Sequence, residues 1–234
     1  MRYNPFLELF RIVYPNQCCA CKQRLYDNEK YLCSGCLSSM LMEAEKGNKR
    51  LIVTKVLKDM PNIEDYNTLF LYDKENNFSD VIQRIKYNNQ PKLGKMLGAF
   101  AAKEFSRWFA NCQVDALLPV PLHRKREQQR GFNQSMKIAE GISEVTHIPI
   151  LNDVFERIVN NKTQTHKNFA ERQENVKGIF QLTQPERLKG KRIMLIDDVM
   201  TTGATISECV KILKSSDKGI KIFVFTLSKA QELI

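Results

Sequence analysis

The sequence predicts an α/β fold, an open and mostly parallel sheet with helices on both faces, preceded by a small cysteine-rich module. Strand-like and helix-like segments alternate through the C-terminal two thirds of the chain. The strand-like segments are continuous apolar runs, as in parallel sheets that are covered on both faces. Five of the seven cysteines lie within residues 18–36. A length of 234 residues suits one full-size domain plus such a module.

The predicted strands and helices follow one another in a regular order. We expect residues 1–45 to form an N-terminal helix and a zinc-binding module, 46–65 a connecting segment, and 66–234 the α/β domain. Strands are predicted at 66–73, 115–122, 153–159, 193–199 and 220–228. Helices are predicted after a cap at Asn77 or Ser79, after Pro91, after Asn133 and from Thr205. Residues 160–178 are long and polar, and we expect a mobile loop there, followed by a short helix.

The start of the chain does not resemble a secretory signal. Glu8 and Arg11 interrupt its apolar run, and no small-residue cleavage site follows. The apolar residues fall instead at the spacing of a short amphipathic helix: Phe6, Leu9, Phe10 and Val13. No stretch approaches the roughly 18 apolar residues of a membrane span. We therefore expect a cytoplasmic protein without a membrane span.

The chain is basic, with 36 Lys and Arg against 26 Asp and Glu and a net charge of +10. This excess is compatible with polyanionic partners, such as nucleic acid, phosphorylated metabolites or an anionic membrane face. Solvated surface lysines are the simpler explanation, so charge alone does not select a partner.

Two C-x-x-C pairs predict a metal site. Cys18 and Cys21 form the first pair, and Cys33 and Cys36 the second. Four thiolates presented by two tight turns suit a tetrahedral zinc ion, with unbound thiols or a redox pair as the alternatives. A site with four protein ligands has no open position, so its role is structural. Cys19 is out of register with both pairs and is expected to be a spare. The two remaining cysteines, Cys112 and Cys209, are expected in the core.

The stretch "IMLIDDVMTTGAT", residues 193–205, carries the strongest functional pattern. In open α/β sheets, ligands bind outside the carboxyl ends of the strands, where this loop lies. Its backbone N–H groups, its hydroxyls and the helix N-terminus that follows suit a phosphate. Asp197 and Asp198 would repel that phosphate, so they are expected to hold sugar hydroxyls, Mg²⁺ or both. The pattern predicts a ribose phosphate ligand.

Two simpler interpretations compete with this one. A Walker B strand would require the sequence G-x-x-x-x-G-K-[ST], which the chain lacks. A simple turn after a strand would leave the Thr-Thr-Gly-Ala-Thr loop unexplained.

Residues 193–205 resemble the phosphoribosyl-pyrophosphate (PRPP) signature of type I phosphoribosyltransferases. Residues 117–135, with "PVPLHRKREQQRGFNQ", and 163–180, with "RQENVKGIF", resemble segments of the ComF family, as do the L-K-Y-like segment at 85–98 and the paired C-x-x-C. The chain thus resembles ComFC-type competence proteins over nearly its whole length. It departs from the family's pattern at Asn89, where glycine is common, and at Gln164, which follows Thr163 closely.

The resemblance implies roles for particular residues. It assigns the 5′-phosphate to Thr201, Thr202, Gly203, Ala204 and Thr205. It assigns the ribose 2′- and 3′-hydroxyls to Asp197 and Asp198. It places a basic loop after the proline-rich strand end, where it would contact pyrophosphate through Mg²⁺. The residues of this loop are His123, Arg124, Lys125 and Arg126. Lys162 and Arg172 flank the mobile segment and could close over the ligand. Without the PRPP loop, the basic cluster would be an ordinary solvated turn.

Two functions remain open from the sequence. The first is a protein of DNA uptake and natural transformation with a retained PRPP and Mg²⁺ site, partnered by single-stranded DNA and by a competence helicase or other uptake proteins. The second is an active phosphoribosyltransferase of nucleotide metabolism, which transfers ribose 5-phosphate from PRPP to an amine or nucleobase. The sequence identifies no acceptor pocket, which favours the first function and leaves turnover open.

Overall fold

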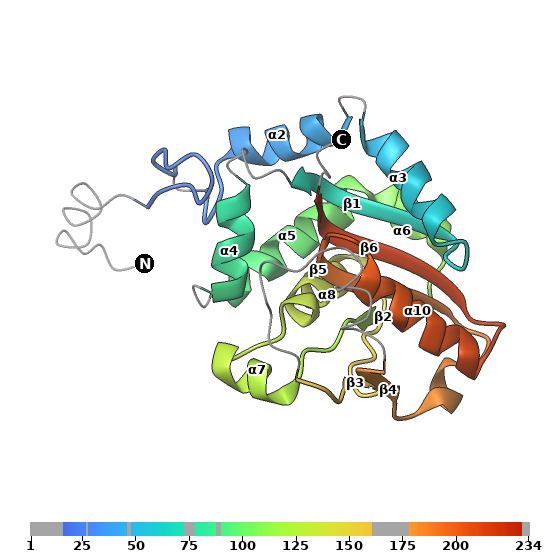
Figure 1. Cartoon of the computed structure of the whole chain (residues 1–234). Helices are drawn as coiled ribbons and strands as arrows, with labels where there is room; N and C mark the ends of the chain where they lie inside the picture. Colours follow the sequence, from blue (N-terminus) through green and yellow to red (C-terminus); the bar gives the residue numbers. More distant parts are fainter. Residues whose placement is uncertain are drawn as a thin grey trace.

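Four parallel strands form the central sheet of the computed structural model, which describes residues 16–26, 28–45, 48–72, 78–87, 90–160 and 178–230. The strands are β1 (Asp65–Tyr72), β2 (Ala116–Pro119), β5 (Arg192–Met200) and β6 (Lys221–Ala230). Their order is β1-β6-β5-β2, and every neighbouring pair is parallel (Figure 1). The expected N-terminal helix lies outside the described residues.

The side chains of the central strands alternate between two cores. In β5, Met194 and Ile196 pack into the core beneath α4 (Ser79–Tyr87), α5 (Pro91–Glu104) and α8 (Gln134–Thr146). Ile193 and Leu195 pack into the opposite core, beneath α3 (Asn48–Asp59) and α10 (Ala204–Ser216). Figure 1 shows α10 in front of the sheet and α5 and α8 behind it. The prediction of an open parallel sheet covered on both faces is confirmed.

The remaining elements lie at the margins of this sheet. They are α2 (Ser34–Glu45), α6 (Ser106–Cys112), α7 (Arg124–Arg130), a 3₁₀ turn η1 (Pro185–Leu188), β3 (Phe155–Arg157) and β4 (Phe180–Leu182). The strand predicted at 153–159 is β3, which pairs antiparallel with β4 in a separate two-stranded sheet. Among the described helices, none is long and apolar enough to cross a membrane.

Two helices differ from the sequence expectation. The segment 46–65, expected as a connection, contains α3, whose Val56 is buried in the second core. The basic segment after β2, expected as a loop, is the helix α7. The Nδ1 atom of His123 accepts a hydrogen bond from the Lys125 backbone N–H at 3.2 Å, which caps the start of α7. Gly131 ends α7 with a φ of 83°, a conformation that glycine adopts readily.

Other local expectations are confirmed. The Asn133 side chain accepts a hydrogen bond from the Ser135 N–H at 3.0 Å and caps α8. Cys112 and Cys209 are 3% and 0% exposed, so both are core residues. The strand predicted at 115–122 is shorter, Ala116–Pro119; the Val120 N–H still donates to the Ile196 carbonyl oxygen at 2.9 Å, and Pro121, which has no N–H, cannot continue the ladder.

Helices α5 and α8 cross so closely that only glycine fits at two positions. A Cβ atom on Gly98 would lie 2.2 Å from the carbonyl oxygen of Ile138, and one on Gly141 would lie 2.0 Å from the carbonyl oxygen of Lys95. Both obstacles are backbone atoms, which cannot move aside alone. The crossing therefore fixes how α8 lies against the sheet, and with it the position of the α8 N-terminus.

We predict that Gly141→Ala lowers the free energy of unfolding by at least about 2 kcal/mol, because the new methyl group forces α5 and α8 apart. Gly94→Ala is the matched control on α5. Its Cβ would meet ordinary contacts, the nearest being Lys137 Cβ at 3.6 Å. The control should be neutral or stabilising by up to about 1 kcal/mol, since alanine favours helix. Urea unfolding measures both. Equal effects of the two substitutions would contradict a steric requirement at Gly141.

Candidate functional site

The candidate site lies at the carboxyl end of β5, beside the end of β2. The two strands pair in register, with Pro119 opposite Ile196. Asp197 and Asp198 follow at once, and residues 201–203 then lead into α10. The fold therefore brings the two carboxylates and the predicted phosphate loop to the sheet edge where ligands bind in open α/β folds.

The loop before α10 is tightly built. Gly203 occupies the N-cap position of α10 with a φ of 77°. A Cβ atom on it would lie 2.1 Å from the Cε atom of Met60. The Ala204 N–H points toward the hydroxyl of Thr202, at 3.4 Å. The positive φ favours glycine here, whereas the terminal methyl group of Met60 can move aside.

A buried lysine supports the start of this loop. Lys229 on β6 is 9% exposed. Its ammonium group donates hydrogen bonds to the carbonyl oxygens of Thr201, at 2.8 Å, and Ala230, at 2.9 Å. These bonds fix the first peptide of the loop against the end of the sheet.

Each of the two carboxylates has its own partners. The Oδ1 atom of Asp197 accepts hydrogen bonds from the Ser135 hydroxyl at 3.0 Å and from the Asp198 N–H at 2.9 Å. The Oδ1 atom of Asp198 accepts from the Val199 N–H at 2.7 Å, and its Oδ2 atom lies 3.2 Å from the Lys86 ammonium. Residues of α8 and α4 thus reach the tip of β5 and hold both side chains.

The Asp197 carboxyl has an unusual proton affinity. Burial, and then the neighbouring negative charge of Asp198, raise the pKa of Asp197 to about 7. The hydrogen bonds from Asp198 and Ser135 and the charge of Lys86 act in the opposite direction but do not cancel these effects. The proton on Asp197 is therefore exchanged near neutral pH.

A cleft of about 780 Å³ lies at the end of β2, the strand that pairs with β5, and Asp197 and Asp198 are not among the residues that line it. Its walls come from the end of β2, from α7 and α8, and from β3. The residues that line it are Pro119, Pro121, Leu122, His123, Arg124, Lys125, Glu127, Gln128, Asn133, Met136, Asn152, Asp153, Phe155, Glu156, Arg157, Ile158 and Thr183.

The basic cluster divides along α7. His123, Arg124 and Lys125 line the cleft, whereas Arg126 belongs to the same helix but not to the cleft wall. Lys162 and Arg172, the other predicted cations, lie outside the described residues.

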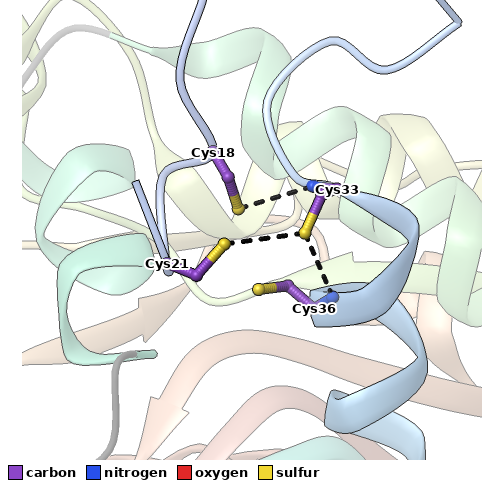
Figure 2. A group of neighbouring side chains, drawn as sticks. All are labelled: Cys18, Cys21, Cys33 and Cys36. Carbon is purple, nitrogen blue, oxygen red and sulfur yellow. Dashed lines mark hydrogen bonds between the residues drawn. The ribbon is translucent and has the colours of Figure 1, made fainter. Parts of the chain in front are cut away.

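A second candidate centre is formed by the four cysteines of the C-x-x-C pairs. The sulfurs of Cys18, Cys21, Cys33 and Cys36 all lie within 4.8 Å of one another and point toward a common centre (Figure 2). The Sγ atoms of Cys21 and Cys33 are 3.7 Å apart. A tetrahedral zinc ion with Zn–S bonds of about 2.3 Å requires sulfur–sulfur distances of about 3.8 Å. The donor set therefore fits a tetrahedral metal ion.

Backbone N–H groups support the sulfurs. The Cys18 Sγ accepts from the Cys33 N–H and the Cys33 Sγ from the Cys36 N–H, both at 3.4 Å. Burial opposes ionisation of Cys18, but hydrogen bonds from the backbone of Cys33, Cys21 and Ala20 outweigh it and lower the pKa of Cys18 to about 7. Cys19 lies apart from the cluster, with its sulfur 4.0 Å from the Gln90 side-chain oxygen.

Four residues of the site were not predicted from the sequence: Ser135, Lys86, Lys229 and Arg157. Ser135 and Lys86 belong to the segments 117–135 and 85–98, so the resemblance contained them without giving them a role. Lys229 and Arg157 carried no local pattern. Only the strand arrangement brings them to the site.

Comparison with known proteins gives relatives along most of the chain. No family model matches the sequence. The chain is 28% identical over 209 residues to competence protein F of Haemophilus influenzae, covering 85% of this chain and 90% of that protein. It is 26% identical over 221 residues to competence protein ComFC of Bacillus subtilis, covering 91% and 84%. These similarities confirm the resemblance to the ComF family.

A shorter match covers 138 residues. It is 28% identical to the DNA utilization protein YhgH of Escherichia coli and spans 58% of this chain and 60% of that protein. All three relatives are named for the handling of DNA or for competence.

Two solved structures are similar to part of the chain. One is an allosteric regulatory enzyme of purine biosynthesis, with a TM-score of 0.40, 18% identity, and coverage of 62% of this chain and 30% of that enzyme. The other is a purine phosphoribosyltransferase from Pyrococcus horikoshii, with a TM-score of 0.33, 18% identity, and coverage of 57% and 80%.

We predict that Asp197→Asn changes how stability depends on pH. Between pH 4 and 7 the folded wild type keeps a proton on Asp197 that the unfolded chain releases, so its stability falls as pH rises through this window. Asparagine is always neutral and keeps the hydrogen-bond acceptor. The variant should therefore match the wild type near pH 4 and be more stable by roughly 2–4 kcal/mol at pH 8.

Urea unfolding at pH 4.5, 6 and 8 measures this difference. Asp217→Asn is a control that should change stability in the opposite direction. Hydrogen bonds from the Gly219 and Gly190 N–H groups lower the pKa of Asp217. That variant should lose stability at pH 8. A constant difference between wild type and Asp197→Asn at all three pH values would contradict the raised pKa.

Proposed function

We propose that this chain is a protein of DNA uptake and natural transformation that binds PRPP with Mg²⁺ at the carboxyl end of β5. The observation that carries the proposal is the adjacent pair Asp197 and Asp198 beside the loop that opens α10. A sugar diol needs hydrogen-bond acceptors, and a phosphate needs N–H donors at a helix N-terminus. The similarity to competence proteins of two bacteria supports the biological role.

The proposed roles follow the chemistry of the residues. Thr201 to Thr205 hold the 5′-phosphate, and Asp197 and Asp198 accept hydrogen bonds from the ribose hydroxyls. The cations at the start of α7 face the pyrophosphate, since arginine and lysine pair well with phosphate oxygens. Bound Mg²⁺ would neutralise part of the pyrophosphate charge, and the carboxylates and phosphate oxygens are the oxygen ligands that this ion prefers. Lys162 and Arg172 stay proposed as further contacts.

Single-stranded DNA is a proposed partner of the same protein. The net charge of +10 and the exposed Arg124 and Lys125 support binding by counterion release, which weakens as salt rises. Since these cations also face the cleft, PRPP should compete with DNA for them. A competence helicase or another uptake protein is the proposed protein partner.

A second candidate function is phosphoribosyl transfer to an amine or nucleobase. It is favoured by the cleft of about 780 Å³ at the end of β2, the strand that pairs with β5, because this volume can admit an acceptor. The leaving pyrophosphate would be stabilised by the cations of the cleft, and exclusion of water would favour transfer over hydrolysis.

We also propose that the cysteine cluster binds zinc in a structural role. Four thiolates with no open position are typical of structural zinc sites. The division of the chain into a zinc module at 1–45, a connection at 46–65 and an α/β domain at 66–234 stays a proposal. The described part of the module shares its core with the α/β domain, since Leu32 and Met40 belong to the same buried cluster as Phe70.

We predict that calorimetry detects PRPP binding in the presence of Mg²⁺, and that Asp197→Ala with Asp198→Ala weakens it by about 100-fold or more, because the ribose hydroxyls lose their acceptors. The matched control removes two exposed carboxylates toward the opposite edge of the sheet: Glu64, which precedes β1, and Glu104, which ends α5. It should change the affinity by less than about twofold. Unchanged binding in the double Asp variant would place the site elsewhere. Pyrophosphate release on addition of amines or nucleobases would favour the second candidate.

For the metal centre, we predict one zinc ion per chain in freshly purified protein, as measured by metal analysis. Cys33→Ser should abolish stoichiometric zinc and lower the melting temperature, because a ligand and the shared core are both lost. Cys19→Ser is the control, since its sulfur lies outside the cluster, and it should keep its zinc. Zinc retained by Cys33→Ser, or lost from Cys19→Ser, would refute this ligand set.

A further inference from the structure

Arg157 is a cation on the wall of the cleft that faces α7. It ends β3 and lines the cleft together with His123, Arg124 and Lys125 on the other side. The sequence analysis gave it no role, and its side chain is only partly exposed.

The guanidinium of Arg157 rests on a rigid aromatic base. Its Cζ atom lies 5.7 Å from the centroid of the Phe180 ring, across the β3–β4 pair. Phe180 in turn stacks on Phe155, with ring centroids 5.3 Å apart and an interplanar angle of 25°. The Nε–H of Arg157 donates to the Val159 carbonyl oxygen at 3.3 Å. These contacts hold one edge of the guanidinium and leave the terminal N–H groups for another partner.

Among the described residues, no carboxylate lies within 4.0 Å of the Arg157 guanidinium. The cleft does contain Asp153, Glu127 and Glu156, but Asp153 is paired with Arg187 at 2.6 Å. Glu156 precedes Arg157 on a strand, so their side chains leave opposite faces. Partial burial removes water from the guanidinium, and a bound anion would compensate for that lost solvation.

The charges around Arg157 also favour a bound anion. Burial, and then the positive charge of Arg126, lower the pKa of Arg157, while Asp197 acts in the opposite direction. Arg157 is therefore close enough to feel both α7 and the carboxylate at the end of β5. An anion bound between Arg157 and α7 would relieve the repulsion and replace the lost solvation.

We propose that Arg157 is an anion-binding residue that contacts the pyrophosphate end of the ligand from the side opposite α7. The planar fork of arginine matches paired phosphate oxygens, and the phosphate loop at the start of α10 takes the other end of the molecule. This assignment rests on the proposed PRPP site and adds to it a second wall for the leaving group.

The test is calorimetry on the full chain with three probes, each with Mg²⁺: PRPP, inorganic pyrophosphate and ribose 5-phosphate. Arg157→Gln should weaken PRPP and pyrophosphate roughly 10- to 100-fold and change ribose 5-phosphate by less than about twofold. Arg107→Gln, which removes an exposed arginine of α6, is the matched control and should leave all three unchanged. Thermal melting checks that the variants are folded.

Arg157→Lys is the conservative variant. It keeps the charge over Phe180 but lacks the fork, so it should remain folded and lose part of the pyrophosphate affinity, about 3- to 10-fold. It carries the test if Arg157→Gln fails to fold.

Several outcomes would overturn the assignment. The first is an unchanged pyrophosphate affinity in a folded Arg157→Gln variant, or in Arg157→Lys if Arg157→Gln does not fold. The second is an equal loss of affinity for all three probes. If the wild type binds pyrophosphate through Arg157 but does not bind PRPP, the proposed function fails and the role of Arg157 stands. If the wild type binds none of the probes, both fail.

Discussion

The structure around the site depends on one electrostatic constraint, the stabilisation of two adjacent carboxylates at the end of a strand. Asp197 and Asp198 repel each other in partly buried surroundings, so neighbouring elements must supply hydrogen bonds and positive charge. Ser135 supplies a hydroxyl from the first turn of α8, and Lys86 supplies an ammonium from the last turn of α4. Ser135 reaches Asp197 from the first turn of α8, a helix whose position is set by the glycine-mediated crossing with α5.

Helix α4 links this constraint to the cysteine cluster. Its first turn carries Asp80, which forms an ion pair with Lys22, beside the first C-x-x-C pair. Its last turn carries Lys86, which pairs with Asp198. Between them its apolar face is buried in the same core that receives the cysteine module. A helix of nine residues therefore contacts both the cysteine module, through Asp80, and the carboxylate pair, through Lys86.

The central sheet and the loop before α10 could be predicted from the sequence because both are local patterns. Continuous apolar runs predict buried parallel strands, and the cap at Asn133 and the loop before α10 are short-range features. Helix α3 was missed because its few apolar residues, among them Val56, are interrupted by Thr54 and Lys55 and flanked by further basic residues, as in a solvated connection. Helix α7 was taken for a loop because its residues are all exposed or half-buried, so no apolar periodicity marks it. Gly131 was the one local feature that indicated its end.

The positions of Arg157 and Lys229 could not be predicted, since they depend on contacts between distant segments. Arg157 completes an alternation of charge beside the ends of the strands, whereas Lys229 holds the loop before α10. The N-terminus of α10 offers N–H groups, the end of β5 offers two carboxylates, and α7 with β3 offers cations. A ligand that matches this order needs an anion, then hydroxyl groups, then a second anion. A nucleoside lacks both anions, and inorganic phosphate lacks the hydroxyls. A ribose that carries a phosphate on one side and a pyrophosphate on the other meets all three requirements: an anion, hydroxyl groups and a second anion.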